Sequence, residues 1–146
     1  MGNFGLKVNR FYEIFVEQNG YVMVLEGLKN TLLIAVIGLI IGIVIGTLIA
    51  AIRTIPQYKV LPRVLNGICS VYVGIFRGTP MVVQLLVFYY VMLPLMGVKM
   101  TGVQVSMIVF GLNSAAYISE IMRSGIMSVD LSLIHISEPT RPRLIS

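Results

Sequence analysis

The residues with the most chemical potential lie together in one apolar stretch near the middle of the chain. Arg77 is followed directly by Gly78-Thr79-Pro80, and Gln84 is the single polar residue in the apolar run after that break. A charged side chain and a broken backbone are costly in lipid unless protein or water shields them. The stretch therefore predicts a translocation path rather than a simple membrane anchor.

A second group of polar residues lies in a later apolar segment. Asn113, Tyr117 and Glu120 fall on one face of a helix, at spacings of three and four residues, and Ser114 is beside them. A polar flank of this kind is expected on a helix that faces a cavity or a partner. Asn113 and Ser114, like Gln84, could line a path for a polar solute, but a hydrogen bond between helices is the commoner role of such residues.

Arg77 and Glu120 are expected at similar depths in the membrane. One arrangement is an ion pair between them, because buried ions in membranes are usually paired. In the other arrangement Arg77 extends its charged head toward the interface, and Glu120 pairs with Arg123 three residues further on. The sequence leaves both arrangements open.

The composition places the chain among multi-span membrane proteins. It has 146 residues, of which 57% are hydrophobic and 12% charged, and its mean hydropathy is +0.91. About 25% charged residues is typical of soluble domains. The net charge of +5 comes from scattered cations rather than a basic stripe, which argues against a nucleic-acid partner. Neither paired acids nor a histidine set for a metal is present before the tail, so no catalytic, metal or cofactor site is predicted.

Three membrane spans are predicted, at about residues 31–52, 68–96 and 103–121. The first has 22 residues without a charge, which is about 33 Å of helix and enough to cross the hydrocarbon core. A straight helix over residues 60–95 would measure about 54 Å, which is too long for one span. The second span is therefore predicted to kink at Gly78-Thr79-Pro80, with residues 60–67 forming an interfacial elbow.

The first span carries a small residue at every fourth position. This regular spacing gives the helix a smooth face on which another backbone can approach closely. Such a face predicts tight packing inside a helix bundle, and it says little about a substrate. The four residues are Gly38, Gly42, Gly46 and Ala50.

The orientation follows from the cations between the first two spans. Arg53, Lys59 and Arg63 lie there with no acid, which favours a cytoplasmic loop. The N-terminus is then outside, and residues 1–30 form an extracytoplasmic or interfacial segment. That segment is predicted either as an amphipathic interfacial helix or as a loosely ordered lead-in to the first span.

The last part of the chain, residues 131–146, differs from the rest. Residues 131–141 resemble the conceptual translation of a transposon-end adapter used in preparing sequencing libraries, and they follow no membrane pattern. We expect this tail to be non-native, or otherwise a short disordered end. Without it the chain loses its only histidine, His135.

Three motifs, in the same order along the chain, resemble the permeases of bacterial ABC importers for polar amino acids. They cover about residues 20–130. The motifs are Gly27-Leu28-Lys29-Asn30-Thr31-Leu32, then Phe76-Arg77-Gly78-Thr79-Pro80 with Gln84 and Tyr89-Tyr90, and finally Ala115-Ala116-Tyr117-Ile118-Ser119-Glu120-Ile121-Met122-Arg123-Ser124-Gly125-Ile126.

The resemblance implies the N-terminal three-span part of a type I importer transmembrane domain, in the lipid bilayer of the bacterial cytoplasmic membrane. Its implied partners are a cytoplasmic ABC ATPase dimer, an extracytoplasmic amino-acid-binding protein and a second permease subunit, identical or similar. ATP hydrolysis would belong to the ATPase, which agrees with the lack of a phosphate-binding Gly-rich loop here. Family members continue beyond the equivalent of residues 128–130 into an ATPase-docking loop and further spans, so a truncated and inactive fragment is expected. The alternatives are a membrane-embedded scaffold and, with least support, an intramembrane enzyme.

Overall fold

The computed structural model describes residues 2–56 and 58–137, with side chains described as far as Val129. This described part is helical and contains no strand, as the predicted all-α class requires. The helices are α1 (Gly2–Tyr12), α2 (Gly20–Thr54), α3 (Val60–Gly78), α4 (Met81–Val87), α5 (Leu93–Met96) and α6 (Gly102–Ser137). Two π-helical turns complete it, η1 (Glu13–Glu17) after α1 and η2 (Phe88–Met92) between α4 and α5.

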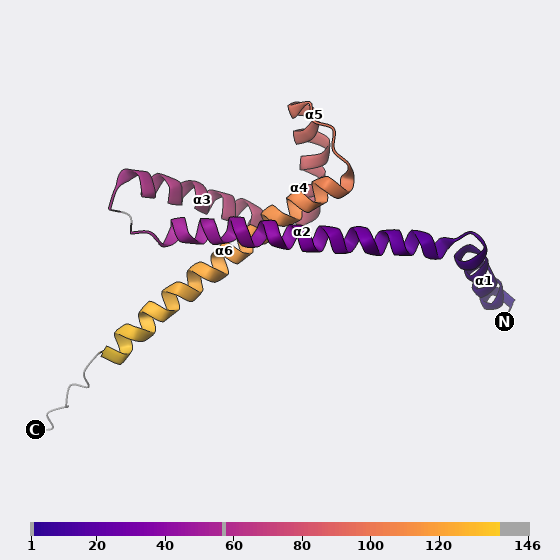
Figure 1. Ribbon diagram of the computed structural model, residues 1–146, viewed down its shortest axis with the longest axis horizontal. Helices are drawn as coiled ribbons and strands as arrows, with labels where there is room; N and C mark the ends of the chain where they lie inside the picture. The colour runs from indigo at the N-terminus through magenta and orange to yellow at the C-terminus, as the bar shows by residue number, and fades with distance from the viewer. Residues whose placement is uncertain (1, 57, 138–146) are drawn as a thin grey trace, which may run out of the picture.

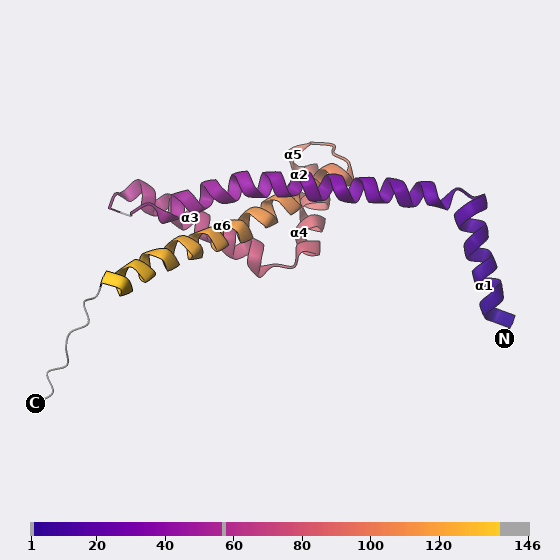
Figure 2. The same cartoon turned by 60° about the horizontal axis from the view of Figure 1, so that its bottom comes forward.

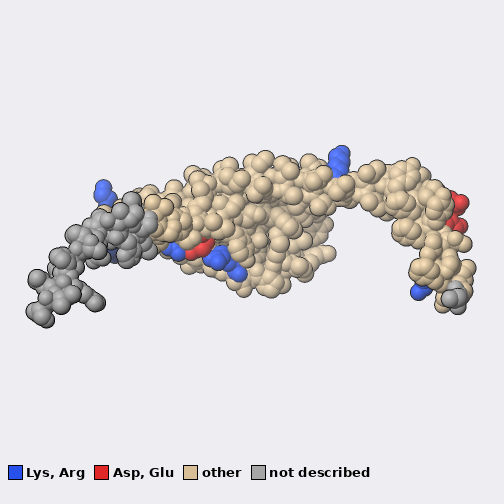
Figure 3. Space-filling view, turned by 90° about the horizontal axis from the view of Figure 1, so that it is seen from below, with Lys and Arg blue, Asp and Glu red and all other residues tan. Residues whose placement is uncertain are grey.

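Helix α2 forms the long axis of the molecule. Figure 1 shows α6 crossing it obliquely and α3 running back along its C-terminal part. The segment from α4 to α5 turns away from these three helices, and α1 turns sharply off the N-terminal end of α2 in both views (Figure 1, Figure 2). The face drawn in Figure 3 is mostly uncharged, with only scattered Lys, Arg, Asp and Glu residues.

Three of the described helices are long and apolar enough to cross a membrane, as predicted. They cover Gly20–Thr54, Val60–Gly78 and Gly102–Val129. The second differs from the expected kinked span over residues 68–96. The break at Gly78-Thr79-Pro80 separates α3, which is long enough on its own, from a shorter apolar helical segment over Met81–Met96.

The helices also extend beyond the expected spans. Helix α2 begins at Gly20, directly after Asn19, which has a left-handed backbone conformation (φ 54°). Helix α3 begins at Val60, so residues 60–67 are its first turns and not a separate elbow. Pro62 is compatible with this start, because the first amides of a helix have no intrahelical acceptor. The backbone of α6 continues to Ser137, and the rest of the predicted tail, residues 138–146, lies outside the described residues.

The most extensive helix contact in the described chain is between α2 and α6, along the small-residue face of α2. Gly38, Gly42, Gly46 and Ala50 are all buried there. A Cβ atom added at Gly42 would lie 2.6 Å from the Cβ of Ser114, and one added at Gly46 would lie 2.9 Å from Cγ2 of Ile118. The two backbones approach so closely that neither glycine position has room for a side chain.

Helix α6 contributes a glycine of its own to this contact, which the sequence analysis did not single out. A Cβ atom at Gly111 would lie 2.7 Å from Cγ2 of Ile41 on α2. Elsewhere along α6, Val109, Ala115 and Ala116 are fully buried. Small residues on both helices therefore create the close approach, as is common in membrane helix pairs.

Helix α3 joins the pair through a smaller contact. Val73 is buried against Ile49 of α2 and Ala116 of α6. The hydroxyl of Tyr72 donates a hydrogen bond to the carbonyl oxygen of Leu112 in α6, at 2.5 Å. This bond joins α3 to α6 beside the apolar contact of Val73.

Removing that bond should have a small effect. We expect Tyr72→Phe to lower the free energy of unfolding in mixed micelles by about 1 kcal/mol, the usual net worth of a neutral hydrogen bond. Tyr58→Phe is the matched control, because Tyr58 is 93% exposed. Equal unfolding curves for the two variants would show that the Tyr72 hydroxyl contributes nothing to stability.

Candidate functional site

The helix break lies where the sequence predicts it. Helix α3 ends at Gly78, and Thr79 and Pro80 both have extended backbones, with ψ values of 144° and 134°. Pro80 has no backbone N–H and disfavours a helical conformation at Thr79, so the helix cannot continue through these residues. A new helix, α4, starts at Met81 and leaves in a different direction (Figure 1).

Gln84 folds back from the first turn of α4 across this break. The two N–H groups of its Nε2 are shared among three acceptors, the carbonyl oxygens of Phe76 (2.9 Å) and Thr79 (3.0 Å) and the hydroxyl of Thr79 (2.7 Å). That hydroxyl in turn donates to the carbonyl oxygen of Ile75, at 2.7 Å. The side chain of Gln84 is therefore part of the corner, the turn between α3 and α4 at Gly78-Thr79-Pro80, and it is only 8% exposed.

Arg77, in the last turn of α3, rests on α6. Its guanidinium carbon lies 5.4 Å from the centroid of the Tyr117 ring, within the range of a cation–π interaction. Tyr117 is on the flank of α6 that also carries Asn113, which is half-buried. Among the described residues, no acid forms an ion pair with Arg77.

The ion pair between Arg77 and Glu120, one of the two predicted arrangements, is thus not formed. Glu120 instead holds two other arginines, with Arg53 of α2 at 2.7 Å from its Oε2 and Arg123 at 2.5 Å from its Oε1. Each carboxylate oxygen of Glu120 is thus paired with an arginine other than Arg77. The local pair between Glu120 and Arg123 is the part of the prediction that the structure contains.

Arg53 is the residue of this ion-pair network that the sequence analysis missed, because it was assigned only to the cytoplasmic loop. It follows Ala50 by three residues and so continues the small-residue face of α2 toward α6. That spacing was the signal in the sequence that could have placed Arg53 at the contact with α6. The side chains of Arg53, Glu120 and Arg123 are 12%, 22% and 29% exposed, so this triad ties α2 to α6 at a partly buried position.

The remaining candidate residue lies in the helix packing. Ser114 is half-buried, and its Cβ faces Gly42 across the contact between α2 and α6. No group of three or more His, Cys, Asp or Glu residues that could hold a metal is found among the described residues.

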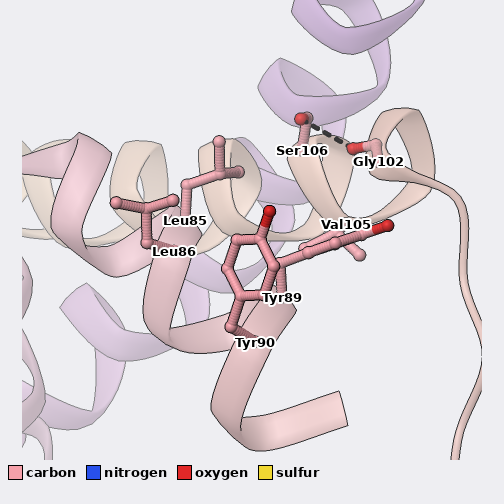
Figure 4. Close-up of a pocket in the computed structure, with 7 residues that line it drawn as sticks. All are labelled: Leu85, Leu86, Tyr89, Tyr90, Gly102, Val105 and Ser106. Carbon is pink, nitrogen blue, oxygen red and sulfur yellow. Dashed lines mark hydrogen bonds between the residues drawn. The ribbon is translucent and has the colours of Figure 1, made fainter. Parts of the chain in front are cut away.

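A cavity of about 270 Å³ lies beyond the break, where α4 and η2 face the start of α6. Figure 4 shows Tyr89 and Tyr90 beside it, with the hydroxyl of Ser106 bonded to the carbonyl oxygen of Gly102 (2.8 Å). Most of the lining is apolar and no charged side chain belongs to it. The cavity therefore has few groups with which to bind a charged solute, and the broken-helix corner is the better candidate site.

Together these features define a multi-pass α-helical membrane protein, in which a tightly packed helix pair supports a broken helix that carries an arginine. No family model matches the chain. It is 38% identical over 107 residues to the putative glutamine transport system permease protein GlnP of Rickettsia bellii, covering 73% of this chain and 47% of that protein. It is 37% identical, over the same coverage of each chain, to the arginine transport system permease protein ArtQ of Bacillus subtilis.

A third relative is the L-cystine transport system permease protein TcyB of Bacillus subtilis, 34% identical over 78% of this chain and 46% of that protein. A crystal structure of an amino acid ABC transporter with histidines superposes with a TM-score of 0.67 at 29% identity, covering 81% of this chain and 53% of that one. The chain is homologous to the permeases of amino-acid ABC transporters, as its three motifs predict. It spans about half the length of the curated relatives it matches.

Proposed function

We propose that this chain is part of a permease subunit that forms the transmembrane path of an ATP-driven importer for a polar amino acid. The homology supports the transporter class, and the names of the relatives, which mention glutamine, arginine and L-cystine, favour an amino acid as the solute. The path would open alternately to the two sides of the membrane.

The observation that carries this proposal is Arg77 beside the broken helix. An arginine at membrane depth is expensive and is by default a functional residue. Arg77 is held against Tyr117 and not by Glu120, whose two oxygens are taken by Arg53 and Arg123. We propose that Arg77 faces the solute path, with Gln84 and Asn113 near it. Ser114 and Glu120 would serve the packing of α2 on α6.

The partners follow from the same class. A cytoplasmic ABC ATPase dimer would hydrolyse ATP, an extracytoplasmic binding protein would deliver the amino acid, and a second permease subunit would complete the path. The protein would then lie in the bacterial cytoplasmic membrane with its N-terminus outside, which agrees with the cations Arg53, Lys59 and Arg63 after the first span. We also propose that residues 1–146 alone do not transport, since they span about half the length of the related permeases.

The test is uptake by the complete transporter. The full-length permease would be recovered, assembled in proteoliposomes with the ATPase and the binding protein encoded beside it, and given a panel of labelled basic, acidic, amide-bearing and sulfur-containing amino acids. We expect ATP-dependent uptake of at least one of them, absent with an inactive ATPase. No uptake of any solute by a stable, ATP-hydrolysing assembly would favour the membrane scaffold instead.

A further inference from the structure

The C-terminal end of α3 would be incompletely bonded without Gln84. The last carbonyl groups of a helix have no intrahelical donor, and in a membrane water cannot easily replace it. At this end the Nε2 of Gln84 supplies the donor for the carbonyl oxygens of Phe76 and Thr79. The donor comes from α4, so one side chain both caps α3 and connects the two helices.

We propose that Gln84 is the positioning residue of the broken helix. Its amide nitrogen fixes the angle between α3 and α4. The same nitrogen donates a hydrogen bond to the carbonyl oxygen of Phe76, the residue directly before Arg77. The backbone that carries Arg77 is then fixed, and this keeps the guanidinium over the ring of Tyr117. The part of this inference that concerns solute movement rests on the proposed function, whereas the helix angle does not.

Gln84 acts through its nitrogen alone. Its Oε1 is buried and has no hydrogen-bond partner among the described residues. Exchanging the oxygen and nitrogen would point an acceptor at three oxygens, so the hydrogen-bond network itself assigns the orientation of the amide. What the corner requires at position 84 is therefore a donor of suitable length, rather than an amide as such.

This requirement predicts how well variants of similar length hold the angle between α3 and α4, in the order Lys, Met, Glu. Gln84→Lys keeps a donor, and its positive charge is favourable at the negative end of α3. Gln84→Met keeps the length but has no donor. Gln84→Glu has nearly the shape of glutamine but places a carboxylate against two carbonyl oxygens and a hydroxyl that already donates to Ile75. A role in packing alone would give a different order, with Met best tolerated and Lys worst.

The helix angle would be measured first, by spin-label distances in nanodiscs. With Cys69 replaced by serine, labels at Val71 on α3 and Leu86 on α4 report the corner, and both positions are exposed in this chain. We expect one narrow distance distribution for wild type and Gln84→Lys, a broader one for Gln84→Met and the broadest for Gln84→Glu. Labels at Val44 and Val71 control for the packing of α2 on α3. A distribution for Gln84→Glu as narrow as that of wild type would overturn the inference.

Uptake by the assembled transporter is the second readout. We expect Gln84→Glu to lower the uptake rate about tenfold, the effect of leaving buried carbonyl groups without a donor. Gln84→Lys should retain most of it, and Val83→Met, on the exposed side of α4, should leave it unchanged. If wild type itself shows no uptake, the proposed function fails while the distances still decide the role of Gln84. If the Gln84 variants differ from wild type in their distance distributions but not in their uptake rates, a role of Gln84 in transport is rejected.

Discussion

Replacing Gly42 by leucine is expected to prevent stable packing of α2 on α6. Even a Cβ atom at this position would lie 2.6 Å from the Cβ of Ser114, and its next nearest neighbours are backbone atoms of α6. The contact can accept a side chain only if the two helices move apart. Overpacking a core typically costs 1–3 kcal/mol, and we expect at least about 3 kcal/mol here because the obstacle at 2.6 Å is a Cβ atom, which can move only with its backbone.

The same helix offers a matched control. Gly27 is also in α2, but a Cβ atom added there meets nothing within 4 Å. Gly27→Leu should therefore unfold at nearly the same denaturant fraction as wild type in mixed micelles, measured by circular dichroism. If Gly42→Leu were as stable as Gly27→Leu, the described contact between α2 and α6 would be wrong.

Replacing Glu120 by methionine should have the second largest effect. The variant leaves Arg53 and Arg123 without their carboxylate, and Arg53 is only 12% exposed. Removing one partner from a fully buried pair costs 3–5 kcal/mol. Because these side chains keep some exposure, we expect a loss of about 2 kcal/mol in the free energy of unfolding.

A double-mutant cycle identifies the partner. Arg53→Met alone should also destabilise the protein, but Arg53→Met combined with Glu120→Met should cost less than the sum of the two, because no unpaired charge remains at Arg53. The control is Arg63→Met, since Arg63 is exposed on α3 and lies outside the triad. Additive losses for Arg53 and Glu120 would show that the two side chains do not interact.

Features set by neighbouring residues could be predicted from the sequence. The break at Gly78-Thr79-Pro80 follows from the backbone chemistry of glycine and proline, which acts locally. The small-residue face of α2 follows from a four-residue spacing, although the identity of the facing helix does not. The three motifs were enough for the family resemblance, which the relatives confirm.

Features that depend on how helices cross could not be predicted in this way. Arg77 and Glu120 were placed at similar depth, but depth alone does not decide which arginine a carboxylate meets. The oblique crossing of α6 over α2 brings Glu120 to Arg53 instead. Likewise, a lone glutamine in an apolar run indicates only that a partner exists. That Gln84 reaches back across the break depends on the direction in which α4 leaves Pro80.

The central claim is that the broken helix beside Arg77 faces a solute path rather than lipid. The most direct test is thiol accessibility in the full-length transporter lacking Cys69, using a membrane-impermeant maleimide. With Gly78→Cys, which replaces a glycine with open space around it, we expect labelling that depends on the nucleotide state and is reduced by the transported amino acid. Leu39→Cys, in the charge-free run of α2, should remain unlabelled. Absence of labelling at position 78 in every state, in a transporter that remains folded, would contradict the account.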